Sequence, residues 1–349
     1  MNFISFRNNY FKLIIIFLIF FLFDYLFFID TYPPGWDQGY HLSNLFIMSN
    51  IISDDNINFF EKFDNLLNVT DNYRGPLTYL VSSFPLIIFK NNSYTGAYLS
   101  NHIFNFFICI LIYEIGKTFK NNSIGIYAVI IFTFSPFIIM QRTDYLIDLS
   151  LTCFFCLSII TFLKWLNSKE NFSKYSILSG LSVGFIFLVK PTSIIFLLMP
   201  IIYLFIFKFR NIEKKKLYLI EISLFFVSFI FIIFPWFSRH WLTIITSTLN
   251  AWKWGINYQD GLDAFSFEGW IFYIKKLPEI LGFFNIFNIV ILFIIKILTK
   301  NVNFIFKKNI NKNELLFFVF LLNFYLVISL MSTKDLRFLM PIFPLICIY

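Results

Sequence analysis

The chain has 349 residues, of which 58% are hydrophobic and 14% are charged, and its mean hydropathy is +0.73. Because soluble domains carry about 25% charged residues, this composition excludes an ordinary soluble protein and predicts a multi-pass membrane protein. The formal net charge of +8 does not indicate nucleic-acid binding, since the basic residues stand in short runs between apolar stretches, as topology signals do.

Apolar segments recur along the whole chain, and a helix needs about 20 such residues to cross a bilayer. The first segment is too long for a signal-peptide core and lacks a small-residue cleavage site, so we expect it to remain as an anchor. The predicted fold is an all-α polytopic bundle of about ten transmembrane helices, forming a single domain over residues 1–349. The predicted spans are 12–30, 96–116, 123–140, 145–164, 175–190, 191–207, 217–236, 279–299, 313–332 and 336–349.

A polar segment, residues 31–76, follows the first span and is itself followed by a short apolar piece, residues 76–89. This piece is too short to cross a bilayer comfortably, so we expect a re-entrant or interfacial helix. If it crossed, the basic run at residues 208–216 would lie outside, against the positive-inside bias. We therefore expect a cytoplasmic N-terminus in the plasma (inner) membrane, with residues 31–95 and 237–278 as outer loops.

Asp37 is the first candidate for chemistry. It comes directly after a Pro-Pro-Gly turn, where it could cap a helix through residues 42–52. Alternatively it is a functional carboxylate at the membrane surface, flanked by Trp36 and Tyr40, although such aromatic residues also form ordinary interfacial belts. The sequence leaves both roles of Asp37 open.

Basic residues adjoin several apolar segments at the predicted outer face. Arg74 stands just before residues 76–89 and could bind a phosphate near the lipid headgroups. Lys190 lies at a tight hairpin between two spans, and Arg337 precedes the last span, so both are placed to meet an anionic ligand. For each of them, snorkelling of the side chain toward the headgroups is the alternative.

A second acidic segment joins two predicted spans with almost no loop. Asp144 and Asp148 are four positions apart, which places them on one helix face, and Arg142 is close enough to pair with either. A carboxylate such as Asp148 within an apolar span normally faces a cavity or a partner, so a substrate contact and a structural ion pair are both open. Cys153 and Cys156 have CxxC spacing, but without a second pair or a nearby His we expect no metal site.

The candidate residues all lie on the predicted outer side of the membrane. That topology rests on the basic runs in the loops, so it is independent of the candidate residues. Carboxylates beside several cations suit a lipid phosphate together with a neutral acceptor. A carboxylate can accept a proton from an acceptor hydroxyl or amine, and cations can stabilise the charge that builds on a departing phosphate. The candidate site residues are Asp37, Tyr40, Arg74, Arg142, Asp144, Asp148, Lys190 and Arg337.

The order of these motifs resembles that of the polytopic GT-C glycosyltransferases. In particular it is similar to the bacterial branch related to dolichyl-phosphate-mannose protein mannosyltransferases and to the aminoarabinose transferase that modifies lipid A. Two departures are visible, because Gln38 follows Asp37 where the family often has Glu, and Gly75 stands in place of a proline. The matching segments are residues 36–40, 74–79, 141–148, 180–184, 189–192, 235–236 and 337–341.

The resemblance implies a GT-C-type bundle whose large first outer loop carries interfacial helices, and an inverting glycosyltransferase without a cofactor. The donor would be a polyprenyl-phosphate sugar and the acceptor a lipid, glycan or protein. Asp37 would act as the base or orient the acceptor, Asp144 would shape the acceptor side, and Arg74, Lys190 and Arg337 would hold the donor phosphate. Because the chain stops inside a predicted span, the resemblance implies a short or truncated member.

A transporter or flippase of a lipid-linked glycan is the alternative function. It would use the same cations to bind phosphate but would need no base. Inverted repeats and interrupted helices at the midplane would favour it, and the sequence shows no clear instance of them.

Overall fold

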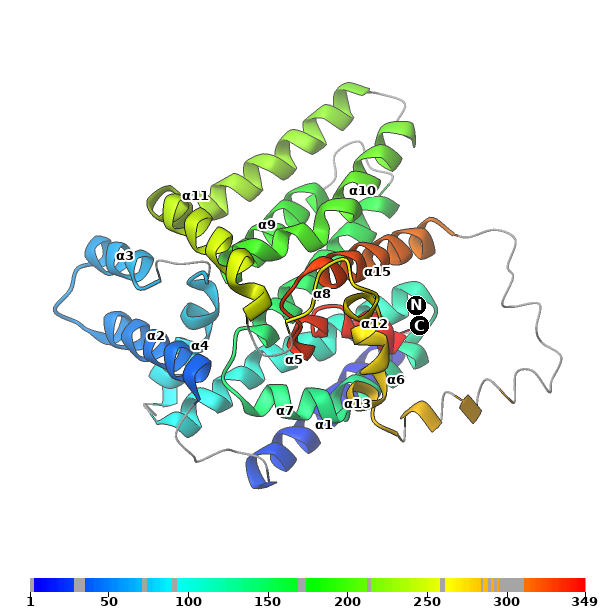
Figure 1. Cartoon of the computed structure of the whole chain (residues 1–349), viewed down its shortest axis with the longest axis horizontal. Coiled ribbons are helices and arrows are strands. Elements are labelled where there is room, and N and C mark those ends of the chain that lie inside the picture. Colours follow the sequence, from blue (N-terminus) through cyan, green and yellow to red (C-terminus); the bar gives the residue numbers. More distant parts are fainter. Residues whose placement is uncertain are drawn as a thin grey trace.

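The computed structural model of the chain is all-helical over the residues that it describes (Figure 1). These residues are 3–27, 35–70, 74–89, 93–168, 174–211, 215–257, 261–283, 285–287, 290, 291, 294 and 311–348. The predicted all-α polytopic membrane fold is confirmed. The helices are α1 (Phe3–Phe27), α2 (Trp36–Ser53), α3 (Phe59–Asn68), α4 (Leu77–Phe89), α5 (Tyr94–Phe119), α6 (Asn122–Thr133), α7 (Pro136–Thr143), α8 (Asp148–Asn167), α9 (Lys174–Val189), η1 (Pro191–Leu197), α10 (Leu198–Asn211), α11 (Lys215–Trp254), η2 (Gly255–Asn257), α12 (Phe267–Lys275), α13 (Leu277–Leu281), α15 (Lys312–Leu330), η4 (Leu336–Leu339) and α16 (Phe343–Ile348).

Within the described residues, six helical segments are long and apolar enough to cross a membrane. The predicted span 123–140 is instead a bent pair, α6 and α7, which meet at 64° because Pro136 starts a new helix; counted as one span, it makes seven. The predicted span 175–190 corresponds to α9, whose 16 residues are too few for it to count among the six, and the predicted span 336–349 is divided into η4 and the six-residue α16. The predicted span 279–299 lies only in part within the described residues. The six segments are Asn9–Phe27, Thr95–Phe119, Asp148–Asn167, Pro191–Arg210, Lys215–Ala251 and Lys312–Leu330.

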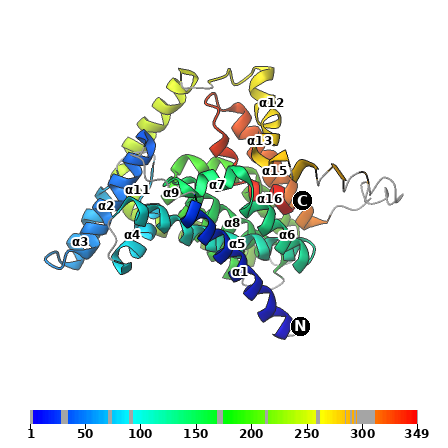
Figure 2. The same ribbon diagram turned by 90° about the horizontal axis from the view of Figure 1, so that it is seen from below.

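Helix α8 forms the centre of the bundle, and α1 lies at its edge (Figures 1 and 2). In α8, 83% of the apolar stretch is buried, whereas in α1 the corresponding share is 17%. A helix that is apolar on all sides is normally buried by its neighbours. The first residue of α8, Asp148, is therefore held by the surrounding helices.

Helices α9 and α11 pack closely through small residues. A Cβ atom on Gly180 would lie 2.1 Å from Ser228 Oγ, and one on Gly184 would lie 1.9 Å from Ile232 Cγ2. Small residues allow membrane helices to approach closely where a larger side chain would hold them apart. This packing fixes α9, whose last residue, Val189, precedes the candidate site residue Lys190.

Helix α11 is longer than the sequence predicted. Its 40 residues extend about 60 Å at 1.5 Å per residue, and Pro235, at the end of the predicted span 217–236, lies inside the helix. Proline is tolerated within membrane helices because neighbouring groups satisfy the backbone carbonyl it leaves free. The expected outer loop 237–278 therefore begins as a continuation of α11.

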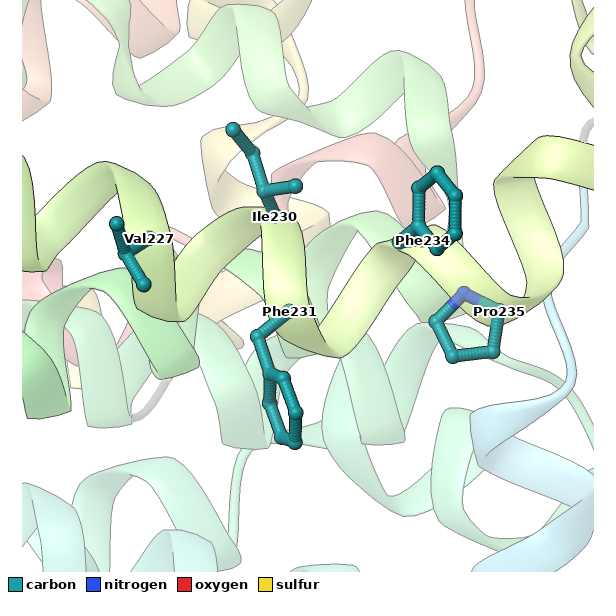
Figure 3. Close-up of a pocket in the computed structure, with 5 residues that line it drawn as sticks. All are labelled: Val227, Ile230, Phe231, Phe234 and Pro235. Carbon is teal, nitrogen blue, oxygen red and sulfur yellow. The ribbon is translucent and has the colours of Figure 1, made fainter.

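One side of α11 carries a shallow apolar hollow (Figure 3). Its volume is about 410 Å³, and none of its lining side chains is charged. Such a surface offers apolar contact, as to the hydrocarbon chains of lipids, and holds no group for chemistry. The lining residues are Val227, Ile230, Phe231, Phe234 and Pro235.

Helices α2, α3 and α4 gather beside the end of α11 (Figures 1 and 2). Trp236 Nε1 donates to the carbonyl of Thr70 at 2.9 Å, and Arg239 forms an ion pair with Asp64 of α3 at 2.5 Å. Helix α4 has 13 residues, in agreement with the predicted short helix at residues 76–89. Its re-entrant or interfacial placement in a bilayer stays a prediction.

Candidate functional site

Asp37 lies in the first turn of α2, and its carboxylate faces two arginines from distant parts of the chain. Oδ1 accepts a hydrogen bond from Arg74 Nη2 at 2.9 Å, and Oδ2 accepts one from Arg337 Nη2 at 3.5 Å. The side chain of Gln38 supplies the helix-capping bond, since its Oε1 accepts from the Gly35 N–H at 3.2 Å. The Asp37 carboxylate thus belongs to a charged cluster and leaves the cap to Gln38.

Arg337 reaches Asp37 from the segment between α15 and α16, and Asp335 holds it in place. The Asp335 carboxylate accepts from Arg337 Nε at 2.7 Å and from the Arg337 backbone N–H at 2.9 Å, which starts the short helix η4. Tyr273 of α12 donates its hydroxyl to the Asp335 carbonyl at 3.3 Å. Helix α12 therefore supports the loop that carries Arg337.

Lys190 and Asp148 complete the group of charges. Asp148 begins α8 and is 7% exposed, and Lys190 lies between α9 and η1. Their charges are close enough to act on each other, and Arg337 acts on both. The first turn of a helix favours a negative charge, which suits the position of Asp148. Lys190 Nζ also lies 5.0 Å from the centre of the Phe338 ring.

Aromatic and imidazole side chains of α2 and α4 support the cluster. The Arg74 guanidinium carbon lies 4.9 Å from the centre of the Tyr40 ring, within the range of a cation–π contact. His41 is buried one turn after Asp37, and its Nδ1 lies 2.6 Å from the Tyr79 hydroxyl. Tyr40 therefore limits where the Arg74 guanidinium can lie.

The surrounding charges shift the protonation of Asp37 and His41. Burial acts to raise the pKa of Asp37, but the neighbouring Arg74 and Arg337 guanidinium groups outweigh it and hold that pKa below its usual value. Burial, and next the positive charge of Arg74, lowers the pKa of His41 to about 3. At neutral pH the cluster contains an ionised Asp37 and an uncharged His41.

Arg142 and Asp144 are placed differently from expectation. Arg142 is buried and pairs with Asp24 of α1, with Nη2 to Oδ1 at 2.8 Å, where the sequence predicted a pair with Asp144 or Asp148. It also donates to the carbonyl of Thr133. Asp144 is the C-cap of α7 in an extended conformation, whereas Asp148 starts α8, so the two carboxylates do not share one helix face. A catalytic role for Asp144 and a substrate contact for Arg142 stay predictions.

Two residues that support the cluster, and the partner of Arg142, were not among the predicted site residues. Asp335 stands two positions before Arg337, and His41 stands one helical turn after Asp37, so their neighbours were the only signal. Asp24 had a stronger one, because a lone carboxylate in an apolar span usually has a buried partner. Over the part of the chain that the structure describes, no three His, Cys, Asp or Glu side chains gather as ligands for a metal ion.

One protein family matches part of the chain. The family described as dolichyl-phosphate-mannose-protein mannosyltransferase matches residues 73–236. That segment contains Arg74, Asp148 and Lys190. Among curated protein sequences, none matches this chain significantly.

Solved structures of two proteins share the fold. ArnT from Cupriavidus metallidurans, bound to undecaprenyl phosphate, aligns with a TM-score of 0.65 and 11% identity over 97% of this chain and 58% of its own. The archaeal oligosaccharyltransferase AglB from Archaeoglobus fulgidus, in complex with an inhibitory peptide and a dolichol-phosphate, aligns with a TM-score of 0.59 and 12% identity over 97% of this chain and 49% of its own. At such identity the likeness shows the fold alone, and the chain spans 58% and 49% of these two structures.

Proposed function

We propose that this chain, a multi-pass membrane protein, is a GT-C glycosyltransferase related to the dolichyl-phosphate-mannose-protein mannosyltransferases and to ArnT, and that it transfers a sugar from a polyprenyl-phosphate-linked donor. The acceptor is a hydroxyl or amine of a lipid, glycan or protein at the outer face of the plasma membrane. The observation that carries the proposal is the ionised Asp37 carboxylate between the Arg74 and Arg337 guanidinium groups. The lipid phosphates bound to ArnT and AglB support a donor of this class.

Arg74, Arg337 and Lys190 hold the donor phosphate in this proposal. A guanidinium group presents two parallel N–H donors to phosphate oxygens, and a lysine ammonium adds a compact charge. The three cations belong to distant segments, and the charges of Arg74 and Arg337 both act on Lys190, which supports a common ligand. When the sugar leaves, the same groups stabilise the extra charge on the phosphate.

The proposed reaction is a single displacement at the anomeric carbon. The acceptor oxygen or nitrogen forms a bond to C1 of the sugar, and the bond from C1 to the phosphate oxygen breaks. The bonding electron pair leaves on that oxygen, which releases polyprenyl monophosphate, and the acceptor proton passes to the Asp37 carboxylate. Because the nucleophile enters opposite the leaving group, the configuration at C1 inverts.

Because Asp37 is ion-paired with the arginines, donor binding also changes the basicity of Asp37. In the free chain, Asp37 occupies the two guanidinium groups that the donor phosphate needs. A bound phosphate therefore replaces Asp37 as a partner of Arg74, and its own negative charge raises the pKa of the released carboxyl group. Asp37 thus becomes a stronger base when the donor is present.

The donor class is tested with purified protein in detergent and two pools, a set of polyprenyl-phosphate sugars and a panel of nucleotide sugars. We expect a glycosidic product only from the lipid-linked pool. Product from nucleotide sugars alone would reject the proposed donor. Transbilayer movement of the lipid in vesicles without any product would identify a flippase.

The role of Asp37 is tested by Asp37→Asn, with Asp55→Asn as a control at an exposed position beyond α2. Loss of a positioned base typically lowers the rate by about 10²–10⁴-fold, and we expect a loss of that size for Asp37→Asn alone. The helix should persist, because Gln38 forms the capping bond. Near-normal turnover by a folded Asp37→Asn variant would remove Asp37 from the mechanism and leave Asp148 and Asp144 as candidates.

A further inference from the structure

Gly75 brings the Arg74 segment against the end of α9 with no side chain in between. Its N–H donates to the carbonyl of Val189 at 2.9 Å. A Cβ atom on residue 75 would lie 2.0 Å from the carbonyl oxygen of Leu188 and 2.5 Å from its carbonyl carbon. Carbon atoms do not approach a backbone so closely, so this separation requires glycine.

This backbone contact adjoins two of the three cations of the site. Arg74 immediately precedes Gly75, and Lys190 immediately follows Val189. Their like charges repel each other, and the positive charge of Arg74 acts on Lys190. The Gly75–Val189 hydrogen bond and the close backbone packing hold the two cations together against this repulsion.

We propose that Gly75 is a positioning residue that sets the separation of Arg74 and Lys190 so that both bind one lipid phosphate. This inference rests on the proposed function and adds to it a residue that touches neither the donor nor the reacting atoms. A methyl group at position 75 has to move the Arg74 segment away from α9 by roughly 1 Å. A misplacement of that size can lower the rate of a positioned reaction by about 10²-fold.

Gly39 supplies a matched control on the same side of the site. It lies in α2 two residues after Asp37, and a Cβ atom there would meet nothing within 4 Å. Alanine is also the better helix former. Gly39→Ala therefore makes the same chemical change next to the cluster without a steric consequence.

The experiment measures the dissociation constant of undecaprenyl phosphate for the purified full chain in detergent. We expect Gly75→Ala to weaken binding by at least about tenfold and Gly39→Ala to change it by less than about twofold. In a Lys190→Met background, Gly75→Ala should lose most of its effect, because the cation it positions is absent. An effect of full size in that background would show general damage to the fold and overturn the inference.

The outcomes separate this inference from the function beneath it. If the wild-type chain binds undecaprenyl phosphate and Gly75→Ala binds it equally well, the inference is wrong and the proposed function stands. If the wild-type chain does not bind it, both are wrong. Should Gly75→Ala fail to fold, hydrogen exchange of the wild-type Gly75 amide decides, because phosphate bound by both cations should slow it. An unchanged exchange rate on addition of saturating lipid would overturn the inference.

Discussion

Asp37 is held between two arginines that it shares with the proposed donor, so its protonation depends on what else those arginines bind. In the free chain its lowered pKa keeps the ion pairs intact above the ordinary aspartate pKa of about 3.9. The contribution of these ion pairs to folding stability is lost only as the pH falls through the lowered pKa of Asp37 in the folded chain. A phosphate that takes over the arginines shifts the loss of the base toward higher pH.

A pair of pH profiles tests this exchange. The profile of kcat/KM reports ionisations of the free enzyme, and the profile of kcat reports those of the donor complex. Because the bound phosphate raises the pKa of Asp37, we expect the acidic limb of kcat to lie at higher pH than the acidic limb of kcat/KM. Coincident limbs, measured with saturating acceptor, would show that the phosphate leaves the Asp37 ion pairs undisturbed.

The sequence predicted the members of the charged cluster better than it predicted which charged residues form ion pairs. Asp37, Arg74, Lys190 and Arg337 could be singled out because each adjoins an apolar segment at the predicted outer face. Arg142 could not be assigned correctly, since its partner, Asp24, is 118 positions away. Sequence spacing predicts partners along one helix, whereas an ion pair between helices depends on tertiary packing.

Between helices, the buried ion pair of Asp24 and Arg142 joins α1 to α7. Removing one member of a buried pair typically costs about 3–5 kcal/mol, because the other charge is left without a partner. We expect Asp24→Asn to lower the unfolding temperature in detergent markedly, and Asp24→Leu combined with Arg142→Leu to lower it less. The exposed pair Asp64–Arg239 is the control, since such pairs contribute about 0–1 kcal/mol. A shift for Asp24→Asn no larger than that for Asp64→Asn would contradict this account.

Helix ends agree with the sequence where a single residue, such as a proline, determines the backbone conformation. The break before Pro136 follows from the restriction that proline places on the preceding residue, although the segment containing it was predicted as one span. At Pro235 the outcome is the reverse: the predicted span ends at residue 236, but α11 continues past Pro235 because it packs against α9. A proline alone thus does not tell whether a membrane helix ends, bends or continues.

For the chain as a whole, the orientation in the membrane is the prediction with the widest consequences. All four cysteines are buried, so their replacement leaves a background for single accessible thiols. We expect Asn68→Cys in α3 to react with an impermeant thiol reagent in intact cells and Lys216→Cys at the start of α11 to remain unreacted. Labelling of Lys216→Cys would place the basic end of α11 outside and reverse the proposed topology.

The pairing of Asp37 with Arg337 also has a consequence for biosynthesis. These residues are separated by 300 positions, and a ribosome delivers Arg337 only after helices α1 to α15 have been made. Until then Asp37 can pair with Arg74 but not with Arg337. Under the proposed function, a newly inserted chain therefore cannot bind the donor phosphate fully until the segment that carries Arg337 enters the bilayer, so that donor consumption begins only after this segment has been made.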